Sequence, residues 1–252
     1  MKKLLIVVLL VTLVFTCVSC GKQASDDANP IPYPDEPYVA FIPSKDYPHA
    51  DSVTSMTEQA TYVVIGTYTE FIKSWNMYGD SDDSYAEGRL YSFAVEEVLK
   101  GSVEEKEILV NQQYLETLSY VESDEKIENG IITEEATWSV EHKIDYNNPM
   151  YIEPELGSRY VLFLDKNTYY YGSSEPFMIK LDGESAQLCS NIYTSSGGEG
   201  GLTSETYTVN GREIVLYSTA LTGEDFVEGS SADDVLNEIR ASVLENPNDV
   251  VR

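Results

Sequence analysis

Histidine is the side chain on which acid–base catalysis and zinc binding at neutral pH most often depend. The 252-residue chain has two, His49 after Tyr47-Pro48 and His142 in the acidic stretch Ser139-Val140-Glu141-His142-Lys143. The sequence contains neither a Gly-x-Ser-x-Gly nucleophile motif nor a His-Glu-x-x-His zinc motif. We therefore expect two surface histidines without a catalytic role, no catalytic residue, no metal centre and no cofactor.

Carboxylates and tyrosines are the other residues that could carry chemistry. Glycoside hydrolysis needs two carboxylates, but among 43 acidic residues no pair stands out. The run Asp80-Ser81-Asp82-Asp83-Ser84 offers oxygen ligands, yet Tyr85 and Tyr91 stand where an EF-hand needs Gly and Glu. A solvated loop with at most weak calcium binding is the favoured interpretation. Tyr169-Tyr170-Tyr171 either forms a stacking platform for sugars or peptides or packs as ordinary strand residues.

The beginning of the chain has the pattern of a secretory signal. Lys2 and Lys3 precede an apolar stretch over residues 4–15, which is shorter than the roughly 20 residues of a transmembrane helix. The next segment, Val18-Ser19-Cys20-Gly21, resembles the lipobox of bacterial lipoproteins, with Cys17 where that family usually has Leu. The resemblance implies that residues 1–19 are a signal peptide, that Cys20 is lipidated, and that the rest lies on the outer face of the bacterial cell membrane. The alternatives are an ordinary cleaved signal followed by a free thiol, or a competing site at Cys17.

Charge and cysteine content restrict the classes of partner. The formal net charge is −27 at pH 7, and removal of Lys2 and Lys3 makes the mature chain more negative. Such a charge repels phosphate backbones, so we expect no nucleic-acid partner. With Cys20 acylated, Cys189 is the one thiol left in the mature chain, which excludes a disulfide framework and predicts a buried, inert thiol.

The chain divides by composition into three parts. Residues 1–19 are the signal peptide, residues 20–48 form a Pro-rich tether, and residues 49–252 form a single β-rich domain with an acidic insertion at 116–157. A short helix is expected after Asp51 or Ser52, and a C-terminal helix from the capping-box-like Ser231-Ala232-Asp233-Asp234 to before Pro247.

Runs of β-branched and aromatic residues predict the strands. They cover residues 61–71, with Gly66 at a bulge or tight bend, and 89–99, 107–112, 159–164, 177–181 and 207–216, the last a hairpin turning at Asn210-Gly211. The run at 159–164 is apolar on both faces and is therefore predicted to be central. The fold class is mainly β, either an OB-like barrel or a twisted antiparallel sheet.

The order of the first four strands, with Val98-Leu99-Lys100-Gly101 and Gly157-Ser158-Arg159-Tyr160, looks like a pattern of bacterial envelope proteins of unassigned activity. It is also similar to the OB-like barrels of netrin-type and metalloproteinase-inhibitor domains, over residues 60–181. The disulfides of that family are absent, and the free amino-terminal cysteine with which its inhibitors chelate zinc corresponds to an acylated Cys20. The resemblance implies the fold and not the inhibitory mechanism.

The hypothesis that follows is a membrane-anchored, extracytoplasmic lipoprotein that acts as a non-enzymatic binding or structural module. Its ligand would be a protein, peptide or glycan, bound through residues 116–157 and neighbouring loops. The alternatives are a carboxylate-based envelope hydrolase and, by fold analogy, a protease inhibitor.

Overall fold

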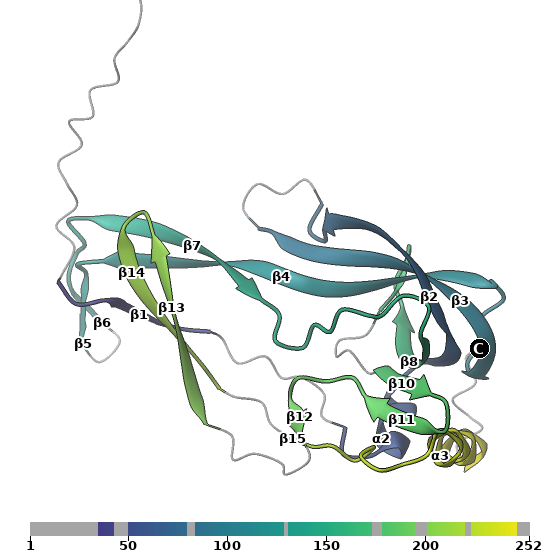
Figure 1. Ribbon diagram of the computed structural model, residues 1–252. Helices are drawn as coiled ribbons and strands as arrows, with labels where there is room; N and C mark the ends of the chain where they lie inside the picture. Colours follow the sequence, from purple (N-terminus) through teal and green to yellow (C-terminus); the bar gives the residue numbers. More distant parts are fainter. Residues whose placement is uncertain are drawn as a thin grey trace, which may run out of the picture. The chain divides into compact units, whose positions relative to one another are not determined.

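The computed structural model describes residues 35–42, 50–79, 84–128, 131–172, 178–194, 201–219 and 223–245 (Figure 1). The chain separates into two units, Met1–Asp35 and Glu36–Arg252, and every helix and strand below belongs to the second. Cys20, His49 and the Asp80–Asp83 run lie outside the described residues.

A large twisted sheet of eight strands forms most of the second unit (Figure 1). Its strands are β2 (Tyr62–Asn76), β3 (Ala86–Lys100), β4 (Glu107–Ser123), β7 (Ser139–Asn147), β8 (Arg159–Lys166), β9 (Tyr171–Gly172), β10 (Met178–Asp182) and β11 (Ser185–Leu188). The order β11-β10-β8-β2-β3-β4-β7 is antiparallel throughout, while the short β9 pairs parallel to β4 and antiparallel to β8. The predicted mainly β fold with a twisted sheet is confirmed. The other predicted form, an OB-like barrel, is corrected, because the sheet is not a closed barrel.

Irregular pairing of β2 with β3 explains much of the twist. The register between these strands shifts at four places, one of them between Ile65 and Gly66. Each bulge adds a residue to one strand and increases the local right-handed twist. The bulge predicted at Gly66 is therefore confirmed.

The sheet carries a core on each face because alternate side chains of a strand point to opposite sides. On one face Val63 and Ile65 of β2 pack with Phe163 of β8, under α2 (Val53–Gln59) and α3 (Ala232–Glu245). On the other face Val64 and Leu162 join a cluster rich in aromatic rings. Strand β8 is buried on both faces and lies between β2 and β10, so its predicted central place is confirmed.

Both predicted helices form, and their caps are those that the sequence indicates. The Ser52 hydroxyl accepts a hydrogen bond from Ser55 N at 3.1 Å, and the Ser231 hydroxyl accepts one from Asp234 N at 3.1 Å. The two helices contact each other, with Glu238 Oε1 of α3 accepting from Thr54 N of α2 at 3.0 Å. Neither helix has the length and hydropathy needed to cross a bilayer.

A second, three-stranded sheet includes part of the expected tether. It consists of β1 (Tyr38–Phe41), β14 (Arg212–Thr219) and β13 (Leu202–Val209), with β1 parallel to β14. Ala40 of β1 is buried while Val39 and Phe41 face solvent, so the strand alternates although prolines flank it. An edge strand tolerates prolines at its ends, which is why this part of residues 20–48 belongs to the domain.

The turn of the β13–β14 hairpin has the predicted form. Asn210 and Gly211 both have positive φ angles, 51° and 81°. A type I′ turn requires positive φ at both central residues, and Asn-Gly is its preferred pair.

Residues 116–157, expected as an acidic insertion outside the β-pattern, consist largely of strands in the part up to Asn147. Strand β4 extends to Ser123 and pairs with β7 over nine residue pairs. Ile144 of β7 is buried with Ile214 and Leu216 of β14, and Leu118 and Tyr120 of β4 pack against them. Alternate residues of an acidic strand can therefore still supply an apolar face. Two small sheets complete the fold, β5 (Lys126–Glu128) with β6 (Ile131–Glu134) and β12 (Tyr193–Thr194) with β15 (Gly223–Glu224).

Candidate functional site

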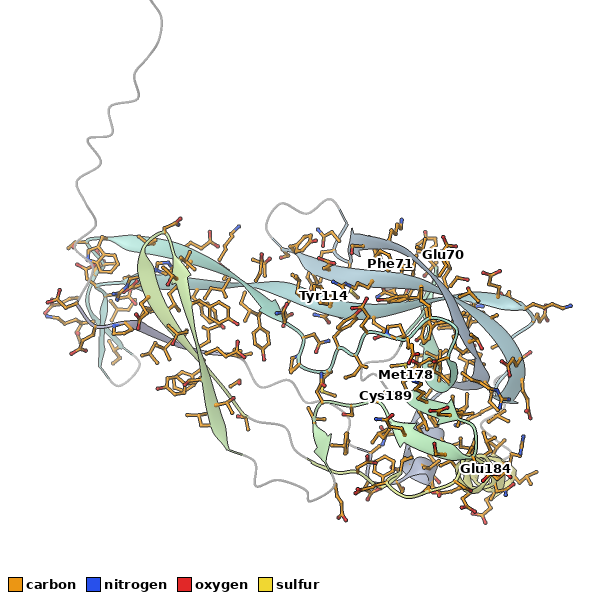
Figure 2. All side chains as sticks on the ribbon, viewed as in Figure 1. Glu70, Phe71, Tyr114, Met178, Glu184 and Cys189 are labelled. Carbon is orange, nitrogen blue, oxygen red and sulfur yellow. The ribbon has the colours of Figure 1, made fainter. Side chains whose placement is uncertain are left out.

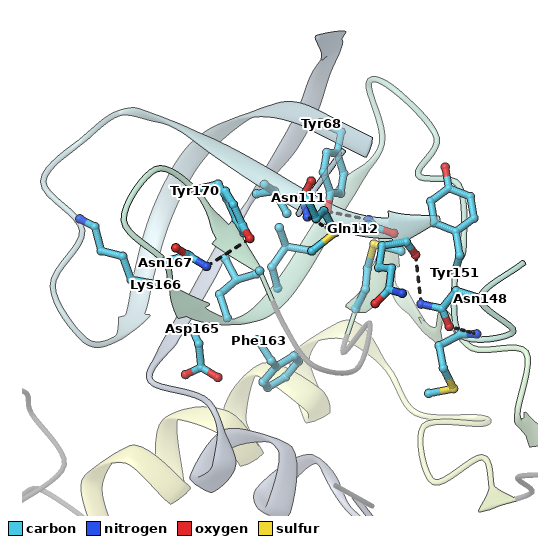
Figure 3. Close-up of a pocket in the computed structure, with 18 of the residues that line it drawn as sticks. Tyr68, Asn111, Gln112, Asn148, Tyr151, Phe163, Asp165, Lys166, Asn167 and Tyr170 are labelled. Carbon is cyan, nitrogen blue, oxygen red and sulfur yellow. Dashed lines mark hydrogen bonds between the residues drawn. The ribbon is translucent and has the colours of Figure 1, made fainter. Parts of the chain in front are cut away.

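A cavity of about 540 Å³ lies on the aromatic face of the large sheet, where β9 connects β4 with β8 (Figure 3). Strand β4 contributes the consecutive residues 110–113, and β8 with the turn after it contributes residues 162–168. The volume is within the range of about 300–1,000 Å³ that is typical of sites for small ligands.

One part of the cavity wall is apolar. Val110 and Leu162 belong to the buried aromatic-face cluster, and Met178 of β10 joins them. Met77 and Met150 add two further thioether side chains to the lining. Methionine is flexible and polarisable, so this wall can adapt to the shape of an apolar ligand surface.

Carboxamides form the polar part of the wall, and several are fixed by hydrogen bonds to the protein. Asn111 Oδ1 accepts from the Trp75 indole N–H at 2.7 Å, and Asn111 Nδ2 lies 3.6 Å from the thioether of Met77. Asn148 Oδ1 accepts from Met150 N, and Asn148 Nδ2 donates to the backbone oxygen of Gln113, both at 3.0 Å. These contacts fix the side chains while leaving second hydrogens and lone pairs available.

Gln112 differs from the other amides because the unpaired end of its side chain is buried. Its Nε2 donates to the Tyr68 hydroxyl at 3.2 Å, whereas its Oε1 is buried and accepts no hydrogen bond within the part of the chain that the structure describes. Tyr68 is itself 1% exposed, and burial raises the pKa of its phenol well above the ordinary value. The Gln112–Tyr68 pair is therefore neutral and leaves one buried acceptor at the cavity.

The tyrosine run 169–171 divides into three environments. Tyr169 is 82% exposed, and Tyr171 is buried in the aromatic-face cluster. Tyr170 lines the cavity, where its ring meets that of Trp75 edge-on at 5.5 Å and its hydroxyl accepts from Asn167 Nδ2 at 3.1 Å. One tyrosine of the run thus fits the predicted platform, and Tyr171 has the alternative packing role.

A second tyrosine of the cavity is held by a cluster of aromatic rings around Arg89. The Tyr151 hydroxyl accepts from Arg89 Nη1 at 3.0 Å and lies 2.7 Å from the hydroxyl of Tyr91. The Arg89 guanidinium lies 3.5 Å from the ring centroid of Tyr114, a cation–π distance. Tyr151 is therefore fixed in orientation before any ligand arrives.

The two charged residues of the lining have partners elsewhere. Asp165 accepts from the backbone N–H and the hydroxyl of Thr61, at 3.3 and 2.5 Å. Lys166 Nζ lies 3.8 Å from Glu105. In Figure 3 both side chains extend away from Asn111 and Gln112. The groups that face the cavity are therefore neutral.

His142, expected at the surface, is buried. Its side chain is 0% exposed, and its Nε2 lies 2.9 Å from Glu122 Oε2. Glu122 also accepts from Arg212 Nη2 at 2.6 Å and Arg212 Nε at 3.1 Å. Burial alone would raise the pKa of the Glu122 carboxyl, but the hydrogen bonds from Arg212 and His142 hold it below its ordinary value. The cluster connects β4, β7 and β14, and none of its three residues lines the cavity described above.

Cys189 has the environment of an inert thiol. It packs partly buried against the aromatic-face cluster, and its backbone N–H donates to Met178 O at 2.8 Å (Figure 2). Burial raises the pKa of the thiol to about 11, so it is protonated at neutral pH.

The described residues contain no group of three or more His, Cys, Asp or Glu side chains placed to hold a metal ion. The calcium expectation concerned the Asp80–Asp83 run and lies outside them. In the described lining of the cavity Asp165 is the single carboxylate, whereas the predicted hydrolase needs a pair.

Comparisons with protein-family models, with curated proteins and with solved structures found no match for this chain.

Proposed function

We propose that this protein is a non-enzymatic binding module of the bacterial cell envelope, anchored to the outer face of the membrane through a lipid on Cys20, and that its ligand occupies the cavity between β4 and β8. The anchor is inferred from the secretory pattern and the Val18-Ser19-Cys20-Gly21 segment. The binding role is inferred from the cavity.

The observation that supports binding is the buried Oε1 of Gln112, which has no partner among the described residues. A buried acceptor left unsatisfied costs about 1–3 kcal/mol. The aliphatic side chain of a leucine would fill this place without that cost. A ligand that enters the cavity and donates a hydrogen bond to this oxygen would satisfy it.

The cavity lies only partly within residues 116–157, the region that the sequence predicted to bind the ligand. Of residues 116–157, Asn148, Met150 and Tyr151 line it, so the carboxyl-terminal part of that range contributes to binding. The other walls come from β4 and β8, which are held by the large sheet on both sides. A rigid sheet that presents fixed polar groups lowers the ordering cost of binding.

The direct test is capture of small molecules by the full chain. The protein is expressed in a bacterial host, extracted in detergent, equilibrated with a small-molecule extract of bacterial envelopes, and washed. Mass spectrometry then identifies what each variant retains. Gln112→Leu removes the buried acceptor, and Gln187→Leu makes the same change at an exposed position of β11.

The proposal predicts a compound that the native chain and Gln187→Leu retain and that Gln112→Leu loses. Retention of the same compounds by all three variants, or of none by the native chain, would overturn the binding role.

A further inference from the structure

We infer that the ligand of this cavity is an apolar compound with a hydroxyl group, whose apolar body contacts Val110 and Leu162 and whose hydroxyl lies between Tyr68 and Gln112. This inference rests on the proposed binding function and specifies the class of ligand.

Alternation along β4 places Gln112 among apolar side chains. Strand β4 pairs with β3 in regular register here, so Val110 and Gln112 project to one face of the strand and Asn111 projects to the other. Val110 and Leu162 belong with Tyr68 to the aromatic-face cluster, and all three line the cavity. Tyr68 and Gln112 are therefore polar groups in a mainly apolar wall.

Tyr68 and Gln112 together leave one hydrogen-bond donor and one acceptor unused. Gln112 Nε2 donates to the Tyr68 hydroxyl at 3.2 Å, which leaves the hydroxyl hydrogen of Tyr68 to be donated (Figure 3). No residue in the described part of the chain accepts that hydrogen, and none donates to Gln112 Oε1. A hydroxyl group accepts and donates at once, so a single ligand hydroxyl can satisfy both residues.

Charged ligands fit this wall less well. A carboxylate would accept from Tyr68, but its charge would then lie close to the partial negative charge of Gln112 Oε1. Arg89 stands opposite Gln112 on β3, yet its guanidinium already donates to the Tyr151 hydroxyl. An ammonium group would need a free carboxylate, and the single carboxylate of the described lining is bound to Thr61.

A ligand with many hydroxyl groups is disfavoured as well. Val110, Leu162 and Met178 offer its hydroxyls no hydrogen bond, and a polar group buried without a partner costs free energy. Met150 and Met178, each 2% exposed, can instead adapt to the shape of an apolar body. A volume of about 540 Å³ holds such a body at the size of a small ligand. The wall therefore favours one hydroxyl on an apolar body.

The test is calorimetric titration with pairs of probes that differ by one hydrogen-bond donor. The pairs are para-cresol, cyclohexanol and hexanol, each with its methyl ether, which keeps the oxygen acceptor and lacks the hydrogen to donate. The full chain is held in phosphatidylcholine nanodiscs, and empty nanodiscs are titrated in parallel to subtract partition into the lipid. Para-toluate, which is anionic, and maltotriose, which is rich in hydroxyls, serve as contrasting probes.

We expect at least one alcohol to bind saturably and about tenfold more tightly than its methyl ether, because only the alcohol donates to Gln112 Oε1. Gln112→Leu should abolish this preference by weakening the binding of the alcohol and not that of the ether. Gln187→Leu, at an exposed position of β11, should preserve it. Para-toluate and maltotriose should not bind. Far-ultraviolet circular dichroism confirms that each variant is folded.

Binding of none of the three alcohols, equal affinity for alcohol and ether, or an unchanged preference in Gln112→Leu would overturn the inference. If the envelope extract yields a retained compound without a hydroxyl group, or if only para-toluate or maltotriose binds, the inference fails and the binding function stands. If the extract yields nothing, both fail.

Discussion

The side chain of Glu122 is 5% exposed and lies between the guanidinium of Arg212 and the imidazole of His142. An ionised carboxylate only accepts hydrogen bonds, so the proton on His142 Nε2 points at Glu122. Each member comes from a different strand, and the ionised carboxylate of Glu122 pairs with the guanidinium of Arg212. At the residue scale this cluster determines how β14 is held against β4 and β7.

Glu122→Gln should destabilise the protein by about 3–5 kcal/mol, because it removes the ionised carboxylate that pairs with the buried guanidinium of Arg212. Urea denaturation followed by circular dichroism measures the change. The control is Glu141→Gln on β7, an exposed carboxylate that meets the Ser119 hydroxyl, for which a change within about 0.5 kcal/mol is expected. Similar losses for the two variants would contradict the cluster's role.

The same cluster predicts a pH dependence with a definite sign. The pKa of Glu122 is lower in the folded protein than in the unfolded chain, so its contribution is fully present above the unfolded value, near 4.3, and is lost as pH falls through the folded value. The difference in unfolding free energy between native and Glu122→Gln protein should therefore shrink on acidification from pH 7 to about 3. A constant or growing difference would show that the carboxylate is not preferentially ionised in the fold.

The structural role of a single residue could be predicted where it depends on neighbours in the sequence, as in the helix caps at Ser52 and Ser231 and the turn at Asn210-Gly211. The burial of His142 was not, because its environment depends on Arg212, which lies 90 residues from Glu122 in sequence. The cavity residues were equally hidden. Gln112 and Asn148 carry no motif, and they line one cavity because β4 continues past its predicted end and pairs with β7, which Asn148 follows.

At the scale of elements, the close pairing of β2 with β3 depends on Gly66. A Cβ atom at this position would overlap the carbonyl oxygen of Ala94 and lie 2.6 Å from Phe93 Cε1. Gly66→Ala should therefore cost about 1–3 kcal/mol, the usual range for overpacking a core. Glu70→Ala, at an exposed position of the same strand, is the control in the same denaturation experiment, and equal stability of both variants would contradict the close approach.

Strand β1 gives a test of where the folded domain begins. Ala40 faces the core against Ile214 and Leu216, while Val39 is 51% exposed on the same strand. Ala40→Asp buries an unpaired charge and should release β1, whereas Val39→Asp should not. Hydrogen exchange at the amides of β14 measures this. Fast exchange in Ala40→Asp and protection in Val39→Asp are expected, and protection in both would mean that β1 is held by other contacts.

Apolar strands could be predicted as elements because residues 61–71, 89–99 and 159–164 are rich in β-branched and aromatic side chains. The extension of β4 and the whole of β7 could not, because their outward residues are acidic and conceal the alternation of Leu118, Tyr120 and Ile144. Strand β1 was hidden by prolines that flank it without interrupting it.

At the scale of the whole molecule, the proposed lipid anchor and the neutral cavity belong to a strongly acidic protein. The chain carries 43 acidic against 16 basic residues, yet amides and phenols face the cavity. Ion pairs such as Arg240 with Glu97 and Arg159 with Glu96 lie at the surface, where each contributes about 0–1 kcal/mol. Such a charge favours solubility and repels polyanions, and in the proposed function ligand recognition depends on uncharged groups.

The anchor itself is tested by metabolic labelling with an alkyne fatty acid in a bacterial host. Cys20→Ser should abolish the label and release the protein from the membrane fraction, because the acylated sulfur is lost. Cys17→Ser should remain labelled and membrane-bound. Persistent label on Cys20→Ser together with its loss from Cys17→Ser would move the lipidation site to Cys17.

The most direct measurement of the central claim is native mass spectrometry of the full chain, extracted from the host membrane and equilibrated with envelope extract. We expect a mature chain that begins at Cys20 with the mass of a diacylglyceryl group, and a non-covalent small-molecule adduct present on Gln187→Leu and missing from Gln112→Leu. A chain without lipid, or an adduct equally present on both variants, would contradict it.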